Sequence, residues 1–116
     1  MAIVRQTIID QIEIRRDGTV NVRLAKCIVD GDTIIHQAYH RYVLEPGADA
    51  ATISAAVDAH LVAMGEVPVE AEDGARIAAV VSQEHTEAVI AAYRAKVERS
   101  RVAEQPAPAP IPVRIG

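Results

Sequence analysis

Two Asp-Gly pairs, at residues 17–18 and 30–31, place the strongest constraint on how this chain can fold. Asp-Gly is typical of the tight turn in a β-hairpin, because glycine adopts positive φ angles at little steric cost. The two pairs divide residues 1–45, which are rich in Ile, Val, Thr and Arg, into runs of about 13, 11 and 12 residues. This pattern predicts a three-stranded antiparallel β-meander.

Apolar residues recur at even positions of the first two runs, as residues on one face of a sheet must; they are Val4, Ile8, Ile12, Ile14, Val20, Val22, Leu24 and Ile28. A two-residue loop at 17–18 would pair even positions with odd ones. A three-residue loop over residues 16–18, with Gly18 in a G1 bulge, pairs Ile14 with Val20 and Ile12 with Val22. We therefore predict the three-residue loop, and the same reasoning favours a loop of odd length around Gly31.

The third run, TIIHQAYHRYVLE, carries apolar bulk on both faces: Ile34, Ala38 and Tyr42 on one, and Ile35, Tyr39 and Val43 on the other. A strand with one face in water alternates between apolar and polar residues. We expect this strand to be covered twice, by helices on one side and by a partner on the other.

Residues 48–104 are expected to be helical and to follow a break at Pro46-Gly47. The first helix has an apolar stripe of Ile53, Val57, Leu61 and Met64, with Ala56 and His60 filling it. Asp49 or Thr52 is the expected N-cap and Gly65 the end. Residues 66–74 form a connector, a second helix begins near Ala75, a break falls at 82–85, and Thr86 caps a third helix. The predicted class is α+β, with a single domain over residues 1–104.

The last twelve residues, 105–116, have proline at every second position from Pro106 to Pro112. Such a segment is incompatible with a helix or a central strand and predicts an extended, polyproline-like arm. A disordered end is the alternative reading. The final residues alternate as Ile111, Val113 and Ile115, which fits a short strand added to another chain.

Composition excludes several classes of protein. The chain has no Trp or Phe, and its formal net charge is −4, which argues against a nucleic-acid-binding protein. Its one cysteine cannot form an internal disulfide. No apolar run approaches the length of a membrane span, and the N-terminus has no signal-peptide pattern. We expect a protein without nucleic-acid or membrane partners, whose modest core is completed by neighbouring subunits.

Residues able to carry out chemistry are present, but no catalytic set can be assembled from them. His36 and His40 share a strand face about 13 Å apart, too far for one metal ion, and His60 lies on an apolar helical stripe. Cys27 lacks a motif for a nucleophile, and the acidic residues near 70–73 lack a calcium-loop pattern. The sequence predicts no enzyme, no metal and no cofactor.

Part of the chain resembles a known group of proteins. Residues 9–49 are similar to the N-terminal half of small proteins encoded near tail and tail-fibre genes of tailed bacteriophages and prophages. The matching positions are Val22, Arg23, Ala25, Ile28, Asp30, Gly31, Tyr39, His40, Arg41, Pro46, Gly47 and Asp49. The stretch TEAVIAAY at residues 86–93 resembles a later helix start of the same group, without its proline. The resemblance implies a virion or tail-associated role and brings no catalytic residue.

These observations predict a non-enzymatic bacteriophage structural protein of the tail, baseplate, fibre or head–tail region. We expect it to be made in the host cytoplasm, to reside in the virion, and to bind copies of itself and other virion proteins through sheet edges and the arm. Tyr39 and Arg41 are candidate contacts because both residue types are enriched at interface hot spots; Ile111, Val113 and Ile115 are the others. The alternatives are an assembly factor absent from the particle and a small regulator that binds a host protein.

Overall fold

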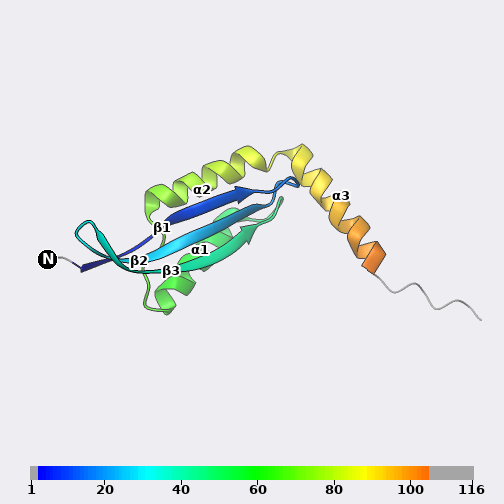
Figure 1. Cartoon of the computed structure of the whole chain (residues 1–116). Helices are drawn as coiled ribbons and strands as arrows, with labels where there is room; N and C mark the ends of the chain where they lie inside the picture. The colour runs from blue at the N-terminus through cyan, green and yellow to red at the C-terminus, as the bar shows by residue number, and fades with distance from the viewer. Residues whose placement is uncertain (1–2, 105–116) are drawn as a thin grey trace, which may run out of the picture.

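The computed structural model describes residues 3–104 and has an α+β architecture (Figure 1), as predicted. Three antiparallel strands in the order β1-β2-β3 are followed by three helices. Their bounds are β1 Ile3–Ile14, β2 Val20–Asp30, β3 Thr33–Leu44, α1 Ala50–Ala63, α2 Ala71–Glu84 and α3 Glu87–Glu104. The predicted arm at 105–116, with Ile111, Val113 and Ile115, lies outside the described residues.

The first hairpin has the predicted turn. Ile14 pairs with Val20 and Ile12 with Val22, so residues 16–18 form a three-residue loop. The Gly18 N–H donates to the Arg15 carbonyl at 3.0 Å, and the Arg15 N–H donates to the Thr19 carbonyl at 2.8 Å. Gly18 has a φ of 92°, the left-handed conformation that a G1 bulge requires.

Strand β1 contains a β-bulge at Asp10, and the predicted alternation of its side chains is therefore wrong for the residues before the bulge. The register shifts between Ile9 and Gln11, so Ile8 pairs with Ala25 and Val4 with Val29. Ile9 and Ile12 face the core, whereas Val4 and Ile8 lie on the opposite face from Ile12. Because one extra residue inverts the alternation of a strand, the even-position rule fails before the bulge.

The second hairpin was predicted to have a loop of odd length, and this prediction is wrong. Asp30 pairs with Thr33, so Gly31 and Asp32 form a two-residue loop, with Gly31 at a φ of 60°. A second irregularity inserts Ile35 between the pairs of β3 with Val29 and Ile28, and it restores even-to-even pairing along the rest of the strand. Strands β2 and β3 therefore pair even positions with even ones, as expected, through a two-residue loop and an extra residue at Ile35 in place of an odd-length loop.

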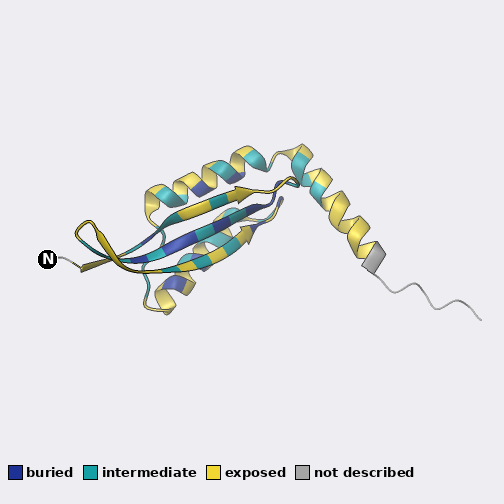
Figure 2. Cartoon of the chain, in the orientation of Figure 1, coloured by how far each residue is buried: buried dark blue, intermediate teal, exposed yellow. Residues whose placement is uncertain are grey.

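The core lies between the sheet and the helices α1 and α2, which cover the same face (Figures 1 and 2). The inward side chains of β2 are its centre: Val20, Val22 and Leu24 are at most 1% exposed. The helices contribute Val57, Leu61, Ile77 and Val81 to this cluster, and Leu44 joins it from the end of β3. The opposite face of the sheet, called the open face below, carries Asn21, Arg23, Ala25 and Cys27 of β2.

Helix α1 begins as predicted, and its apolar stripe is narrower than predicted. The Asp49 carboxylate caps its start by accepting from the Thr52 N–H at 3.2 Å. Val57 and Leu61 are buried, but Met64 is 52% exposed, and Ala56 and His60 are also exposed. The expectation that His60 belongs to the core is therefore wrong, because the buried residues of α1 are Val57 and Leu61 and His60 lies outside this side of the helix.

The second helix begins earlier than predicted. It starts at Ala71 and contains Gly74, which was expected to break the chain. The break before α3 was predicted at 82–85 and falls later, at residues 85–86, because α2 continues to Glu84; the Thr86 hydroxyl accepts from the Val89 N–H at 3.2 Å, as expected of the predicted cap. The polar sequence around 70–74 gives little periodicity from which the first turn of α2 could be recognised.

Helix α3 is attached to the end of the sheet at its first half and then extends away from it (Figure 1). His85 Nε2 lies 2.8 Å from the Gly18 carbonyl oxygen, and Lys96 Nζ lies 3.0 Å from the Asp17 carboxylate. A Cβ added at Gly18 would collide with Val89, so this glycine also permits the close approach of α3. Within residues 3–104, no helix combines the length and the hydropathy needed to cross a membrane.

The packing predicts that the core tolerates little truncation at the centre of β2. Leu24→Ala should lower the free energy of unfolding by about 2–5 kcal/mol, because it removes a fully buried side chain and leaves a cavity. Urea unfolding followed by circular dichroism measures this change. Val102→Ala, at a position that is 61% exposed, is the control and should change stability by less than about 0.5 kcal/mol; equal losses for the two variants would contradict this core.

Candidate protein–protein interface on strand β3

The two outer edges of the sheet differ, and the edge of β1 is covered by the connector between α1 and α2. The Glu70 N–H donates to the Thr7 carbonyl at 3.0 Å, and Thr7 forms an isolated parallel bridge with Val69. The Thr7 hydroxyl donates to the Val67 carbonyl at 2.7 Å. These bonds satisfy backbone groups that an edge strand otherwise exposes.

The bulge in β1 is held by an acidic residue of α2. The Ile9 N–H donates to the Asp73 carboxylate at 2.8 Å, so this side chain replaces a missing strand partner. Asp58 of α1 fixes the same connector by accepting from the Val69 N–H at 3.0 Å. Asp73, which the sequence placed in an acidic connector, is thus part of the covering of the β1 edge.

The outer edge of β3 is open along 12 residues. Among residues 3–104, no backbone hydrogen bond joins this edge to any other segment; β3 pairs with β2 alone. Its apolar side chains stay in solvent: Ile34 and Ile35 are each 54% exposed, Tyr39 51% and Val43 48%. A long, exposed apolar edge is a ready template for another strand.

The predicted double covering of β3 is therefore half correct within this chain. Leu44 is buried, and His40 and Tyr42 are half-buried on the side of the helices, while the other side lies open. Covering by a partner stays a prediction.

Tyr39 and Arg41, the two predicted contacts within the described residues, lie on the open face. Tyr39 is fixed there: the Arg23 guanidinium lies 5.0 Å from its ring centroid, and the Gln37 amide donates to its hydroxyl at 3.2 Å. Arg23 also forms an ion pair with Asp10 at 2.5 Å. Tyr39 is thus an ordered, exposed aromatic side chain, which is well suited to a protein interface.

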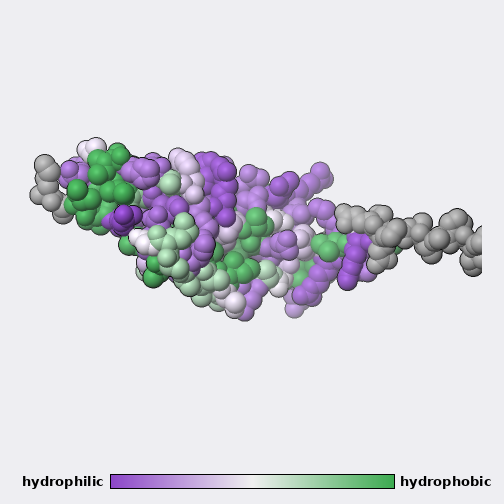
Figure 3. All heavy atoms as spheres, turned by 90° about the horizontal axis from the view of Figure 1, so that it is seen from below, coloured by the Kyte–Doolittle hydropathy of each residue, from purple (hydrophilic) through white to green (hydrophobic). Residues whose placement is uncertain are grey.

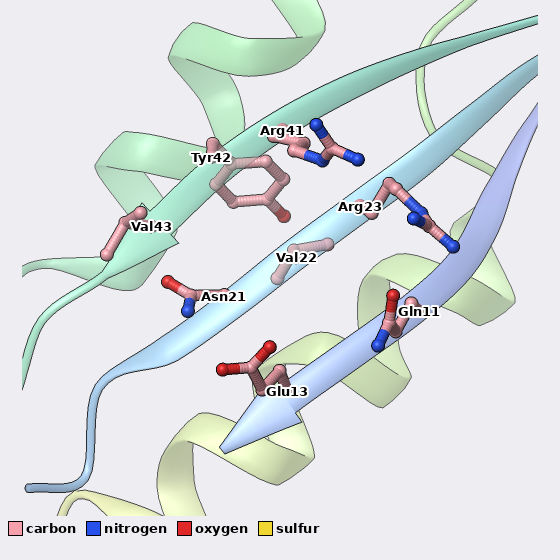
Figure 4. A pocket seen from close by; sticks show the side chains of 8 residues that line it. All are labelled: Gln11, Glu13, Asn21, Val22, Arg23, Arg41, Tyr42 and Val43. Carbon is pink, nitrogen blue, oxygen red and sulfur yellow. The ribbon is translucent and has the colours of Figure 1, made fainter. Parts of the chain in front are cut away.

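Arg41 pairs with Arg23 across the strands and borders a shallow hollow on the open face (Figure 4). Glu13, Asn21 and Gln11 line the same hollow. Within the described part of the chain Arg41 has no ion-pair partner, whereas Arg23 is neutralised by Asp10. An exposed guanidinium of this kind can bind a carboxylate of a partner protein.

The outer side of α1 is a second unusual surface, and the sequence pattern did not predict it. Asp58 is the only Asp, Glu, Lys or Arg among residues 50–63, and it is tied to Val69. A helix without charged residues around its circumference is normally buried, yet much of α1 is exposed. The sequence indicates this surface by the near absence of charged residues in 50–63, a feature that an apolar-stripe pattern does not describe.

The exposed side of α1 next to β3 is a strip of small and neutral residues. His60 marks this side, since its ring centroid lies 5.6 Å from that of His40 on β3. Helical spacing places the exposed residues three, four or eight positions from His60 on the same side. We call this strip the α1 flank; it comprises Thr52, Ala56, His60 and Ala63. Figure 3 shows hydrophobic residues gathered at the end of the molecule next to the N-terminus and in smaller patches farther along, with hydrophilic residues between them.

The histidines do not form a metal centre in the described residues, since no group of three potential ligands occurs there. Partial burial lowers the pKa of His40 below its ordinary value, and the nearby His60 and Lys26 lower it further. Protonation of His40 is therefore unfavourable in the folded chain.

Cys27 lies on the open face of β2, as its parity predicted, and it is buried. Burial raises the pKa of its thiol, and Asp10 raises it further, so the thiol stays protonated at neutral pH. A protonated thiol is a poor nucleophile, and the residue acts here as a small side chain in the sheet.

Comparisons with known proteins returned no relative. No family model matches the chain, no curated protein matches it, and no solved structure matches it. The candidate interface is therefore argued from the geometry of the strands and helices alone.

The covered edge of β1 leads to a stability prediction. Asp73→Ala should lower the free energy of unfolding by about 1–3 kcal/mol, because the half-buried Ile9 N–H loses its acceptor. Urea unfolding measures the change, and Glu72→Ala is the matched control, since it removes a neighbouring exposed acid from the same helical turn. If both variants lose the same stability, Asp73 acts only through its charge at the helix start.

His40 leads to a prediction about pH. Its pKa lies below 6.5 in the folded chain and near 6.5 when unfolded, so the unfolded state binds more protons as the pH falls. The stabilisation is complete above the unfolded pKa, and we expect the free energy of unfolding to decrease between about pH 7.5 and about pH 5.5. His40→Gln should flatten this dependence in urea titrations, while the exposed control His36→Gln should leave it intact; an unchanged slope in His40→Gln would argue against this source.

Proposed function

We propose that this chain is a non-enzymatic structural subunit of a bacteriophage particle, in the tail, baseplate, fibre or head–tail region. The observation that supports this most directly is the open edge of β3 beside an uncharged helix flank. Subunits of symmetric assemblies commonly join through such edges. In this proposal the protein is made in the host cytoplasm, resides in the virion, and has copies of itself and other virion proteins as partners.

The resemblance of residues 9–49 to phage tail-region proteins, noted from the sequence, supports the proposal when the matching residues are sorted by role. Some of them serve the fold: Gly31 forms a hairpin turn, Gly47 has a φ of 88°, and Asp49 caps α1. Tyr39 and Arg41 do not, because both side chains are exposed and contribute nothing to the core. An interface role would account for the presence of these two residues in the motif.

The proposal predicts that the chain is a stoichiometric component of mature particles. Quantitative mass spectrometry of purified particles should find it at a small whole-number multiple of three relative to a known tail protein, as symmetric tails and baseplates require. Infected-cell lysate from the same preparation is the control for abundance.

Absence from particles, together with abundance in infected cells, would contradict the structural role. It would favour an assembly factor instead, and capture of a fibre or tail client would then be expected. Capture of a host protein would favour the small regulator.

A further inference from the structure

We propose that the open edge of β3 binds β3 of a second copy of this chain, antiparallel, about a two-fold axis perpendicular to the sheet. The two sheets would join into one six-stranded sheet, and the two α1 flanks would meet beneath the join. This inference names the partner of the surface used in the proposed function. It depends on the unpaired edge and not on the phage assignment.

The first argument is that the edge needs a partner of matching length. β3 offers 12 residues, which span about 41 Å when extended. A second β3 supplies the same length with a complete set of backbone donors, apart from the local irregularity at Ile35. Residues 105–116 are the alternative occupant, because prolines at every second position leave the intervening N–H groups free to pair on one side; truncation at residue 104 distinguishes the two partners.

The second argument is that one partner must cover two surfaces. The edge of β3 and the α1 flank lie side by side, as the contact between His40 and His60 shows. A single peptide strand would pair with the edge and leave the uncharged flank in water. A second copy covers both, because its own α1 accompanies its β3.

The third argument is the fit of the helices. α1 contacts β2 through the core and β3 through His60, so it lies beneath the space between these two strands. A two-fold axis at the edge of β3 then places the two α1 axes about two strand spacings apart, roughly 9.6 Å. This separation falls in the usual range of about 8–10 Å for packed helices; with the axis at the middle of β3, the two helices approach each other at the end of α1 beyond His60, where the small side chain of Ala63 permits it.

The fourth argument is that the surface carries little charge to repel its copy. Arg41 is the only Asp, Glu, Lys or Arg of β3, and full overlap of two strands centres the axis at Ala38 or Tyr39. The two Arg41 side chains are then separated by several residues along the join. With the axis at Ala38, Tyr39 faces Gln37 of the other copy, which repeats the hydrogen bond that these two residues make within the chain.

The interface has the size of a weak dimer. A strand edge of about 41 Å, roughly 10 Å high, gives about 400 Å² per copy, and the ends of the two α1 helices add to it. The total of about 800 Å² from the strands alone lies below the range of about 1,200–2,000 Å² for stable interfaces, so we expect a dimer that dissociates on dilution.

The first test is the oligomeric state of the full chain and of a chain ending at residue 104, by sedimentation equilibrium over a concentration series. Both are expected to form dimers with similar Kd. A monomer at all concentrations would overturn the proposal, and a dimer lost on truncation would assign the edge to the C-terminal segment instead.

The second test places charge on the α1 flank. Ala63→Lys should raise the dimer Kd by at least about tenfold, because Ala63 lies one helical turn beyond His60 toward the middle of β3, so that the two lysines would approach each other near the axis. Ala79→Lys, at an exposed alanine of α2, is the matched control and should leave the Kd unchanged. Circular dichroism verifies that both variants fold; equal Kd values for the two variants would overturn the placement of α1.

The third test reads the register by crosslinking. In a Cys27→Ala background, Ala38→Cys or Tyr39→Cys should form a disulfide-linked dimer under mild oxidation, since residues on the axis bring their Cα atoms within about 7 Å. Thr33→Cys, at the end of the strand, should not. Crosslinking at Thr33→Cys alone would exclude the antiparallel, centred pairing. The outcome is independent of whether the chain is found in phage particles.

Discussion

The burial of the inner face of β2 is the interaction on which the rest of the structure depends. Val20, Val22 and Leu24 meet Leu61 of α1 and Ile77 of α2, which joins the sheet to both helices at once. Since the chain has no Phe or Trp, this small aliphatic cluster has no large aromatic side chain to extend it. The outer strands contribute Ile9, Ile12, Tyr42 and Leu44, whereas Ile34, Ile35, Tyr39 and Val43 of β3 are exposed.

Much of the fold was predictable because local chemistry determines it. Asp-Gly turns, the Asp49 cap and the Thr86 cap depend on residues close in sequence, and the structure has all of them. The bulges at Asp10 and Ile35 were not predicted, and the first depends on a bond to a residue far away in the sequence. Asp73 holds the first from a position 64 residues away, and no local pattern announces such a bond.

The candidate interface shows the same division. Tyr39 and Arg41 were identified from residue type and are exposed on the open face, whereas the asymmetry of the two sheet edges required the structure. The β1 edge is covered by Val69 and Glu70, which the sequence indicated only as a connector. The sequence does not show that the weakly charged helix α1 lies beside the open edge of β3, because that arrangement depends on the packing of α1 on the sheet.

The attachment of α3 links the geometry of one turn to a distant part of the molecule. This helix has 18 residues, about 27 Å in length, and it contacts the first hairpin turn through Val89 beside Gly18, near its start, and through Lys96 on Asp17, at its middle. A change in the orientation of the first hairpin turn would therefore change the orientation of the whole helix. A tilt of about 10° at that turn would move the far end of the helix by about 5 Å. The few residues of the Asp17-Gly18 turn thus set the direction in which α3 leaves the sheet.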